Sequence, residues 1–247
     1  MNVYAQYCDD FYVNMTLNTA MPLPSQRETI LHFFDRIRKS YPAMRNFYAR
    51  DRHELVLETD KAGGSHQWCS IEPRRILSGQ LNPESVDVAV EQHRLVLELA
   101  PYHLSVTPLD CEAIDLLFGF DFTYRGNHNE LLADVLGVPP AFERVAEMPS
   151  RQVVHYEPSL VLSFDSECRL QCRISTETRT TDYHVRTGEY PEDQLSVYVT
   201  ARHYGGLPDD QDFSKTLELL KETCFTVVDR YVLEGILQPL AKAIALG

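Results

Sequence analysis

Residues 212–246 read DFSKTLELLKETCFTVVDRYVLEGILQPLAKAIAL, and this stretch predicts one long helix with an apolar stripe. Its apolar side chains recur at helical spacing, which places them on one side of the helix. They are Phe213, Leu217, Leu220, Cys224, Val227, Val228 and Tyr231. Because an isolated helix is marginally stable in water, we expect this one to lie across a wide apolar surface, with Asp212 as its N-cap. Pro239 is expected to kink or end the helix near Gly235.

Three strand-like segments upstream supply the surface that this helix needs. They are Leu160–Phe164, Cys168–Thr178 and Leu195–Tyr204, and Cys168–Thr178 shows the clearest alternation of apolar and polar residues. Asp165-Ser166-Glu167 joins the first two as a short hairpin turn. The second half of the chain is therefore expected to be a three-stranded sheet covered by the long terminal helix.

The first half predicts strands and helices in a different order. A strand at residues 11–17 precedes a helix at residues 25–41, and several short strands follow between residues 46 and 81. A second helix starts at Asn82-Pro83 and stops before Pro101. The clearest strand, Ile114–Tyr124, places its phenylalanines on one face. This is the element order of a ferredoxin-like split β-α-β unit.

These patterns predict an α+β protein with two antiparallel-sheet layers or subdomains, each covered on one face by helices. The boundary is expected near residue 126, which gives one unit at 1–126 and another at 127–247.

Composition excludes several classes of protein. The chain has 247 residues, of which 44% are hydrophobic and 24% charged, so wholesale disorder is not expected. The net charge is −13, which disfavours binding to a nucleic-acid duplex. No apolar run is long enough to span a membrane, and residues 1–10 lack the pattern of a signal peptide. The cytoplasm is therefore the expected compartment.

Six cysteines are present, and their spacing does not indicate a metal site or a disulfide framework. Cys168 and Cys172 are the closest pair, but along one strand their Cα atoms would be about 13 Å apart. A disulfide needs Cα atoms within roughly 7 Å, so we expect reduced, mostly buried thiols.

No phosphate-binding loop, nucleophile elbow or zinc-protease motif is present. The strand at 168–178 carries Arg169 and Arg173 on its polar face, where arginines can bind a carboxylate or phosphate. The alternative is an ordinary solvated strand face with cross-strand ion pairs.

Two further groups of polar residues are candidate ligand sites. The loop Thr181–Asp193 concentrates Asp182, His184, Arg186 and Glu189 beside Tyr183 and Tyr190, although aromatic residues in a polar loop more often anchor it to the body of the protein. His128 and Glu130 follow the strong strand and could form an acid–base pair or half a metal site; helix capping is the simpler interpretation. His66 and Cys69 could be a base and a nucleophile, although nothing in the sequence fixes their geometry.

The leading hypothesis is a non-enzymatic binding or adaptor protein, with no cofactor and no metal, whose partner is a protein or a small molecule. The alternative is a small-ligand protein with a pocket between the three-stranded sheet and the terminal helix, possibly with hydrolytic activity. A carrier of this kind needs a cavity of about 300–1,000 Å³ under the helix, whereas an adaptor needs that space filled. A metal-dependent enzyme using His128, Glu130 or His184 is a third hypothesis.

Overall fold

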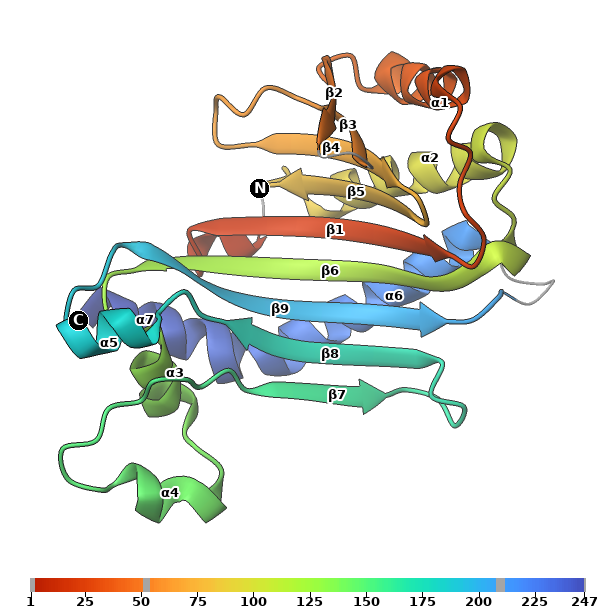
Figure 1. The fold of residues 1–247 in the computed structure, drawn as a ribbon. Helices are drawn as coiled ribbons and strands as arrows, with labels where there is room; N and C mark the ends of the chain where they lie inside the picture. The colour runs from red at the N-terminus through yellow and green to blue at the C-terminus, as the bar shows by residue number, and fades with distance from the viewer. Residues whose placement is uncertain (1–2, 51–53, 208–211, 247) are drawn as a thin grey trace.

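The computed structural model describes residues 3–50, 54–207 and 212–246. Within these ranges the chain forms one antiparallel sheet of nine strands, in the order β2-β3-β4-β5-β1-β6-β9-β8-β7 (Figure 1). The strands are β1 (Asp10–Thr19), β2 (Asn46–Arg50), β3 (Glu54–Glu58), β4 (His66–Glu72), β5 (Arg75–Leu81), β6 (Cys111–Tyr124), β7 (Ser159–Ser163), β8 (Leu170–Glu177) and β9 (Asp193–Tyr204). The protein is therefore α+β, as predicted, with β2 and β7 as the edges of its sheet.

Helices cover one face of the sheet. α2 contacts β1 and β5, α6 contacts β6 and β9, and α1 packs on α2. The helices are α1 (Arg27–Ser40), α2 (Val86–Leu104), α3 (His128–Leu136), α4 (Pro140–Ala146), α5 (Asp182–Thr187), α6 (Phe213–Val227) and α7 (Gln238–Leu246), with the 3-10 helices η1 (Val3–Gln6) and η2 (Pro108–Asp110) and the π-helical segment η3 (Val228–Leu237).

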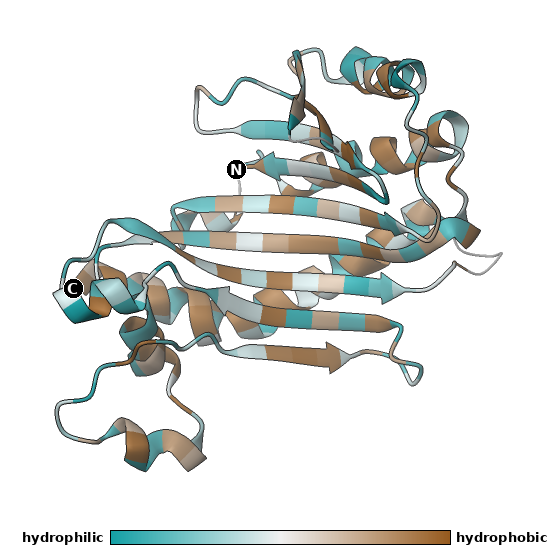
Figure 2. Ribbon diagram, viewed as in Figure 1, coloured by the Kyte–Doolittle hydropathy of each residue, from teal (hydrophilic) through white to brown (hydrophobic). Residues whose placement is uncertain are grey.

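The core lies between the sheet and these helices. Along β1, Phe11, Val13, Met15 and Leu17 are fully buried, while the residues between them are half-buried. The same alternation appears as bands of colour along the strands in Figure 2. The period of two residues thus gives the sheet one apolar face beneath the helices and one polar face without them.

β6 is the internal strand that the sequence predicts most clearly. It pairs with β1 on one side and with β9 on the other. Phe118 and Phe120 are fully buried, and Phe122 is nearly so. The prediction of a central strand with a buried aromatic face is confirmed.

The terminal helix also forms where the sequence predicts it. Asp212 caps α6, because its side chain accepts a hydrogen bond from the Lys215 N–H at 2.7 Å. Pro239 does not end the helix, however. The chain passes from α6 into η3, whose π-helical turns precede Pro239, and it remains helical to Leu246. Proline has no N–H and so cannot donate to a carbonyl of the preceding turn. The i→i+5 pattern of the π-helical turns changes which carbonyls need a donor near Pro239.

The prediction of two sheet layers is wrong. β7, β8 and β9 do not form a separate three-stranded sheet, because β9 pairs along β6 from Ala113 to Tyr124. A separate sheet would leave the long apolar strand β6 with an unpaired edge, which pairing with β9 removes.

The ferredoxin-like unit is not confirmed, since four strands rather than two lie between α1 and α2. The division at residue 126 stays a prediction. In the part of the chain that the structure describes, no helix has both the length and the apolar character needed to cross a membrane.

Candidate functional site

The face of the sheet that the helices do not cover holds a cavity of about 420 Å³, and we call this face the open face. We call this cavity the central groove, because its lining residues extend from β4 to β7, across strands that lie side by side in the sheet (Figure 1). Its volume is in the range of small-ligand sites. Its open-face lining consists of Asn14, Thr16, Trp68, Leu77, Asp115, Leu117, Val161, Gln171, Arg173, Thr200, Arg202 and Tyr204.

Strand register explains why these residues lie together. One row across the sheet pairs Arg173 with Thr200, then Thr200 with Leu117, Leu117 with Asn14, and Asn14 with Gly79. The adjacent row runs through Gln171, Arg202, Asp115, Thr16 and Leu77. Strands lie about 4.8 Å apart, so these rows form a floor roughly 20 Å long that runs across the strands.

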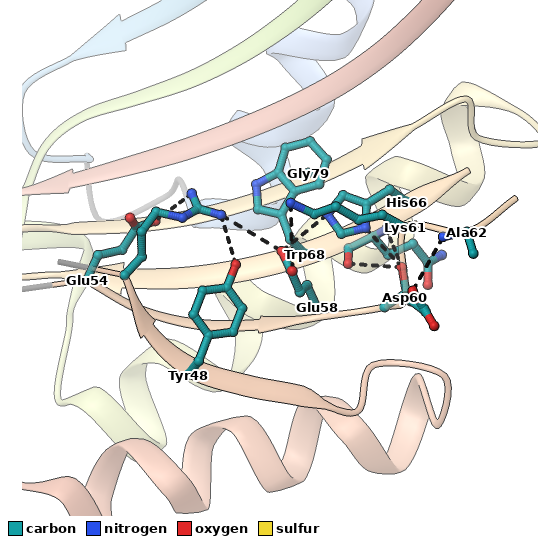
Figure 3. A network of polar contacts seen from close by, with 12 residues as sticks. Tyr48, Glu54, Glu58, Asp60, Lys61, Ala62, His66, Trp68 and Gly79 are labelled. Atoms are coloured by element: carbon teal, nitrogen blue, oxygen red, sulfur yellow. Dashed lines mark hydrogen bonds and ion pairs between the residues drawn. The ribbon is translucent and has the colours of Figure 1, made fainter. Parts of the chain in front are cut away.

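Trp68 closes one end of this floor. It pairs with Gly79 on the neighbouring strand, and its indole ring lies over that glycine (Figure 3). A Cβ atom at Gly79 would come within 2.0 Å of Trp68 Cζ2, so a residue with a side chain would displace the ring. The glycine therefore provides the space that holds a flat aromatic surface against the open face.

Asp115 and Arg202 form an ion pair in the groove floor. Arg202 Nη2 donates to Asp115 Oδ2 at 2.7 Å, and its Nε donates to Oδ1. Arg202 Nη1 also donates to the Tyr204 hydroxyl at 3.2 Å. The hydrogen bond to Asp115 raises the pKa of Arg202 further above its usual range. The two charges offset each other and hold both side chains in place.

Arg173 differs from Arg202 in its surroundings. Its Nε donates to the Ser159 hydroxyl at 3.1 Å, and among the described residues no carboxylate lies within ion-pair distance of its guanidinium. Asn14 lies in the same row, and its Oδ1 atom is buried without a hydrogen-bond partner in the described ranges. The groove thus offers an uncompensated cation and an unused hydrogen-bond acceptor, although the net charge of the whole protein is −13.

A second polar cluster supports Trp68 from the side of β3 (Figure 3). The nearly buried Glu58 is approached by His66 Nε2 at 3.3 Å, Lys61 Nζ at 3.8 Å and Arg50 Nη2 at 3.9 Å. The His66 ring stacks on Trp68, with centroids 5.4 Å apart. Burial lowers the pKa of His66, against the opposing effect of Glu58. Because His66 Nδ1 contacts the Thr59 hydroxyl at 3.2 Å, both ring nitrogens already have partners, which favours a supporting role.

The pairing of His66 with Cys69 as base and nucleophile is wrong. The two residues are three apart on β4, so they point to opposite faces. Cys69 is fully buried on the helix side, where burial raises the pKa of its thiol far above the usual range.

His128 and Glu130 do not form a pair in the structure. Buried His128 is held by the Tyr124 carbonyl at 3.2 Å from Nε2 and by the Arg179 N–H at 3.3 Å from Nδ1. Burial lowers its pKa. Glu130 instead accepts hydrogen bonds from Arg151 at 2.7 Å and from the Val153 N–H at 3.2 Å. Asn127 caps α3, as the capping interpretation predicts.

The segment with Asp182, His184 and Arg186 was predicted to be a loop, but the structure shows the short helix α5 there. Thr181 caps it, and His184 Nδ1 accepts the Thr181 N–H at 3.3 Å. Arg186 lies over the Tyr183 ring at 5.7 Å. His184 lines an open surface depression with Tyr183 and Tyr190, away from the central groove. α5 therefore uses its polar residues mainly for its own caps and contacts.

Of the predicted residues, Arg173 alone lies in the central groove. Arg169 precedes β8, and its Nε lies 3.9 Å from Glu167. Sequence reasoning missed Trp68, Asn14 and the Asp115–Arg202 pair. The alternation along β6 places Asp115 on the polar face, but the sequence does not show which strands flank it.

Among the described residues, no group of three or more His, Cys, Asp and Glu side chains is arranged to hold a metal ion. Burial of His128 against backbone groups and the ion pair of Glu130 leave neither side chain free to act as a ligand without rearrangement.

Comparison with known proteins gives no family. No protein-family model matches the chain, and no curated protein matches it. Two solved structures of alkyldihydroxyacetonephosphate synthase, in different crystal forms, align at 10% identity over 95% of this chain, with TM-scores of 0.18 and 0.17. The chain spans 43% and 42% of the length of those chains. Scores this low carry no argument about fold or function.

Proposed function

We propose that this protein is a non-enzymatic binding protein that holds its ligand in the central groove of the open face. The observation that carries the proposal is Arg173, a cation without a carboxylate partner among the described residues, in a groove with an aromatic end wall. Guanidinium groups bind carboxylate and phosphate oxygens, and an indole face stacks on flat or apolar groups.

The lining defines the class of ligand. Leu117 and Leu77 are two separate apolar positions in the floor. Thr200 pairs with Leu117 and Thr16 pairs with Leu77, and both threonines add hydroxyl groups. Asn14 Oδ1 can accept a hydrogen bond from a ligand N–H or O–H group. These groups fit a ligand that carries a carboxylate or phosphate together with an aromatic or apolar part.

The alternative, a carrier with its pocket beneath the terminal helix, has less support. Leu217, Leu220 and Cys224 on α6 are fully buried, and Cys224 Sγ lies 3.4 Å from the Leu116 carbonyl of β6. The space between α6 and the sheet is therefore filled at these positions. A hydrolytic reaction in the groove would also require Asp115 to leave its ion pair with Arg202 before it could act as a base.

Net charge and cysteine content support two further parts of the proposal. A protein of net charge −13 whose groove cation Arg173 has no carboxylate partner among the described residues is suited to a compact anionic group rather than to a polyanionic duplex. We also propose the cytoplasm as its compartment, where the six thiols stay reduced.

Arg173 and Trp68 lie at opposite ends of a floor roughly 20 Å long, so a small probe bound at Arg173 is detected by isothermal titration calorimetry rather than by Trp68 emission. Phenyl phosphate and benzoate are suitable probes, with phenol and benzamide as their neutral counterparts. The anionic probes should bind with saturable heat, and the neutral ones should not. Arg173→Gln should weaken binding of phenyl phosphate by about fivefold, or about 1 kcal/mol, since Arg173 is solvent-exposed.

Arg169→Gln is the matched control, because it removes the same charge just before β8 and outside the groove lining. It should leave the dissociation constant for phenyl phosphate within twofold of the parent value. Equal binding of neutral and anionic probes, or equal effects of the two arginine substitutions, would contradict the proposal.

A further inference from the structure

The edge strand β7 has the sequence SLVLS from Ser159 to Ser163, which reads the same in both directions. A two-fold axis through an antiparallel strand pair sets each residue opposite its counterpart from the other end. If the axis passes at Val161, two copies of β7 place Val161 opposite Val161, Leu160 opposite Leu162, and Ser159 opposite Ser163. Every cross-strand pair then joins residues of the same type.

The backbone of β7 is oriented for this register. The Phe164 N–H donates to the Leu170 carbonyl at 2.8 Å, and the Thr176 N–H donates to the Pro158 carbonyl at 3.2 Å. Because antiparallel hydrogen bonds alternate along a strand, the even-numbered residues of β7 pair with β8. Ser159, Val161 and Ser163 therefore direct their N–H and C=O groups toward the edge. A two-fold pair centred on Val161 would form about six hydrogen bonds from these groups.

The side chains of β7 leave this edge unprotected. Leu160, Val161 and Leu162 are 55%, 52% and 43% exposed, and the strand carries no charged residue. In Figure 2 most of β7 has the colour of apolar residues. The opposite edge, β2, ends in Arg50 and follows Arg45, and such charges normally block pairing between edges.

We propose that two copies of this chain associate through antiparallel pairing of β7 with β7, which makes one continuous sheet of both subunits. A five-residue strand alone buries less than the ~1,000 Å² of a specific interface. Additional apolar surface is available from α4, which Figure 1 places beyond β7 on the same side of the sheet. Phe142 and Val145 on α4 are 61% and 59% exposed.

This arrangement also connects the interface with the central groove. Val161 lines the groove and pairs with Arg173 in the same row. In the dimer the row continues into the second copy, so the two grooves open on the same face. The two Arg173 residues would then be three strand steps apart, or about 14 Å.

Sedimentation velocity over a concentration series tests the proposal. The parent protein should shift from a species of 28.4 kDa to one of twice that mass as its concentration rises. Val161→Lys and Val161→Glu each place like charges directly opposite across the axis, and each should raise the dimer dissociation constant at least tenfold. An equimolar mixture of V161K and V161E should restore the dimer, because unlike charges then face each other.

Ala49→Lys on the exposed edge strand β2 is the matched control, and it should leave the dimer dissociation constant unchanged. Restoration by mixing separates a lost interface from a folding defect, since two misfolded variants cannot repair each other. A parent protein that stays monomeric at its highest soluble concentration would overturn the proposal. So would a mixture of V161K and V161E that stays monomeric, or an A49K variant that dissociates as readily as V161K.

Discussion

Phe120→Ala tests the position of β6 at the centre of the fold. Phe120 is fully buried, and its ring lies 5.2 Å from the ring of Phe11 and 5.6 Å from that of Tyr4. Deleting a buried phenyl ring costs about 3–5 kcal/mol, and loss of two aromatic contacts places this case in the upper part of that range. A domain is typically stable by about 5–15 kcal/mol, so the variant should be close to unfolding.

Equilibrium unfolding in urea measures this free energy. With a urea m-value of about 2–3 kcal/mol per molar, a loss of about 4 kcal/mol lowers the unfolding midpoint by roughly 1.3–2 M. Asp121→Asn is the control on the adjacent residue, which points to the open face. Burial raises the pKa of Asp121, so its ionised form costs stability at neutral pH, and a neutral amide should change the free energy of unfolding by less than about 1 kcal/mol. If Phe120→Ala proved as mild as Asp121→Asn, the closed aromatic core beneath α6 would be refuted.

Four further outcomes are expected. A chain that ends at Asp212 should lose cooperative thermal unfolding, because it exposes the core under α6, whereas a chain that ends at Gln238 should still melt cooperatively. Thiol titration of denatured, unreduced protein should find all six cysteines free, and four or fewer would contradict this expectation. Gel-shift assays at physiological salt should detect no duplex DNA binding, since the net charge is −13. Burial lowers the pKa of His93 to about 3, so the free energy of unfolding should fall as the pH drops from about 6.5 toward 3. His93→Gln should reduce this pH dependence by up to about 1.4 kcal/mol per pH unit, as measured by thermal or urea unfolding.

Local patterns predicted most of the strands and helices, because their signals lie within a few residues of one another. The alternation in β1, β6 and β9 and the apolar stripe of α6 all correspond to buried faces in the structure. The boundaries were less accurate where proline was the signal. α2 begins after Ser85 rather than at Pro83, and it runs past Pro101 to Leu104. Burial of Leu104 in the core stabilises that last turn despite the proline.

The number of sheets could not be predicted, because strand pairing is a long-range property. β6 and β9 are separated by α3, α4, α5 and two strands, yet they form a continuous ladder. The sequence of neither strand indicates which strand lies beside it in the sheet. An amphipathic pattern fixes only that one face is buried, and this condition is met equally by two small sheets or by one large one.

The candidate site was hidden for the same reason. The central groove follows rows that cross the strands, so adjacent members such as Thr200, Leu117 and Asn14 come from three strands far apart in the chain. The pattern of a single strand was enough to identify Arg173 on the polar face of β8. For Asp115, the same kind of pattern indicated only a position on the polar face of β6. The sequence predicted Arg173 and Arg169 together, but only the structure shows that their partners differ. Arg169 lies near Glu167, whereas Arg173 has only a serine hydroxyl among the described residues. Arg202, which the sequence did not single out, pairs with Asp115. Whether a cation in the groove lacks a carboxylate partner thus depends on strand register, which is why comparing anionic with neutral probes tests the site more directly than any further motif could.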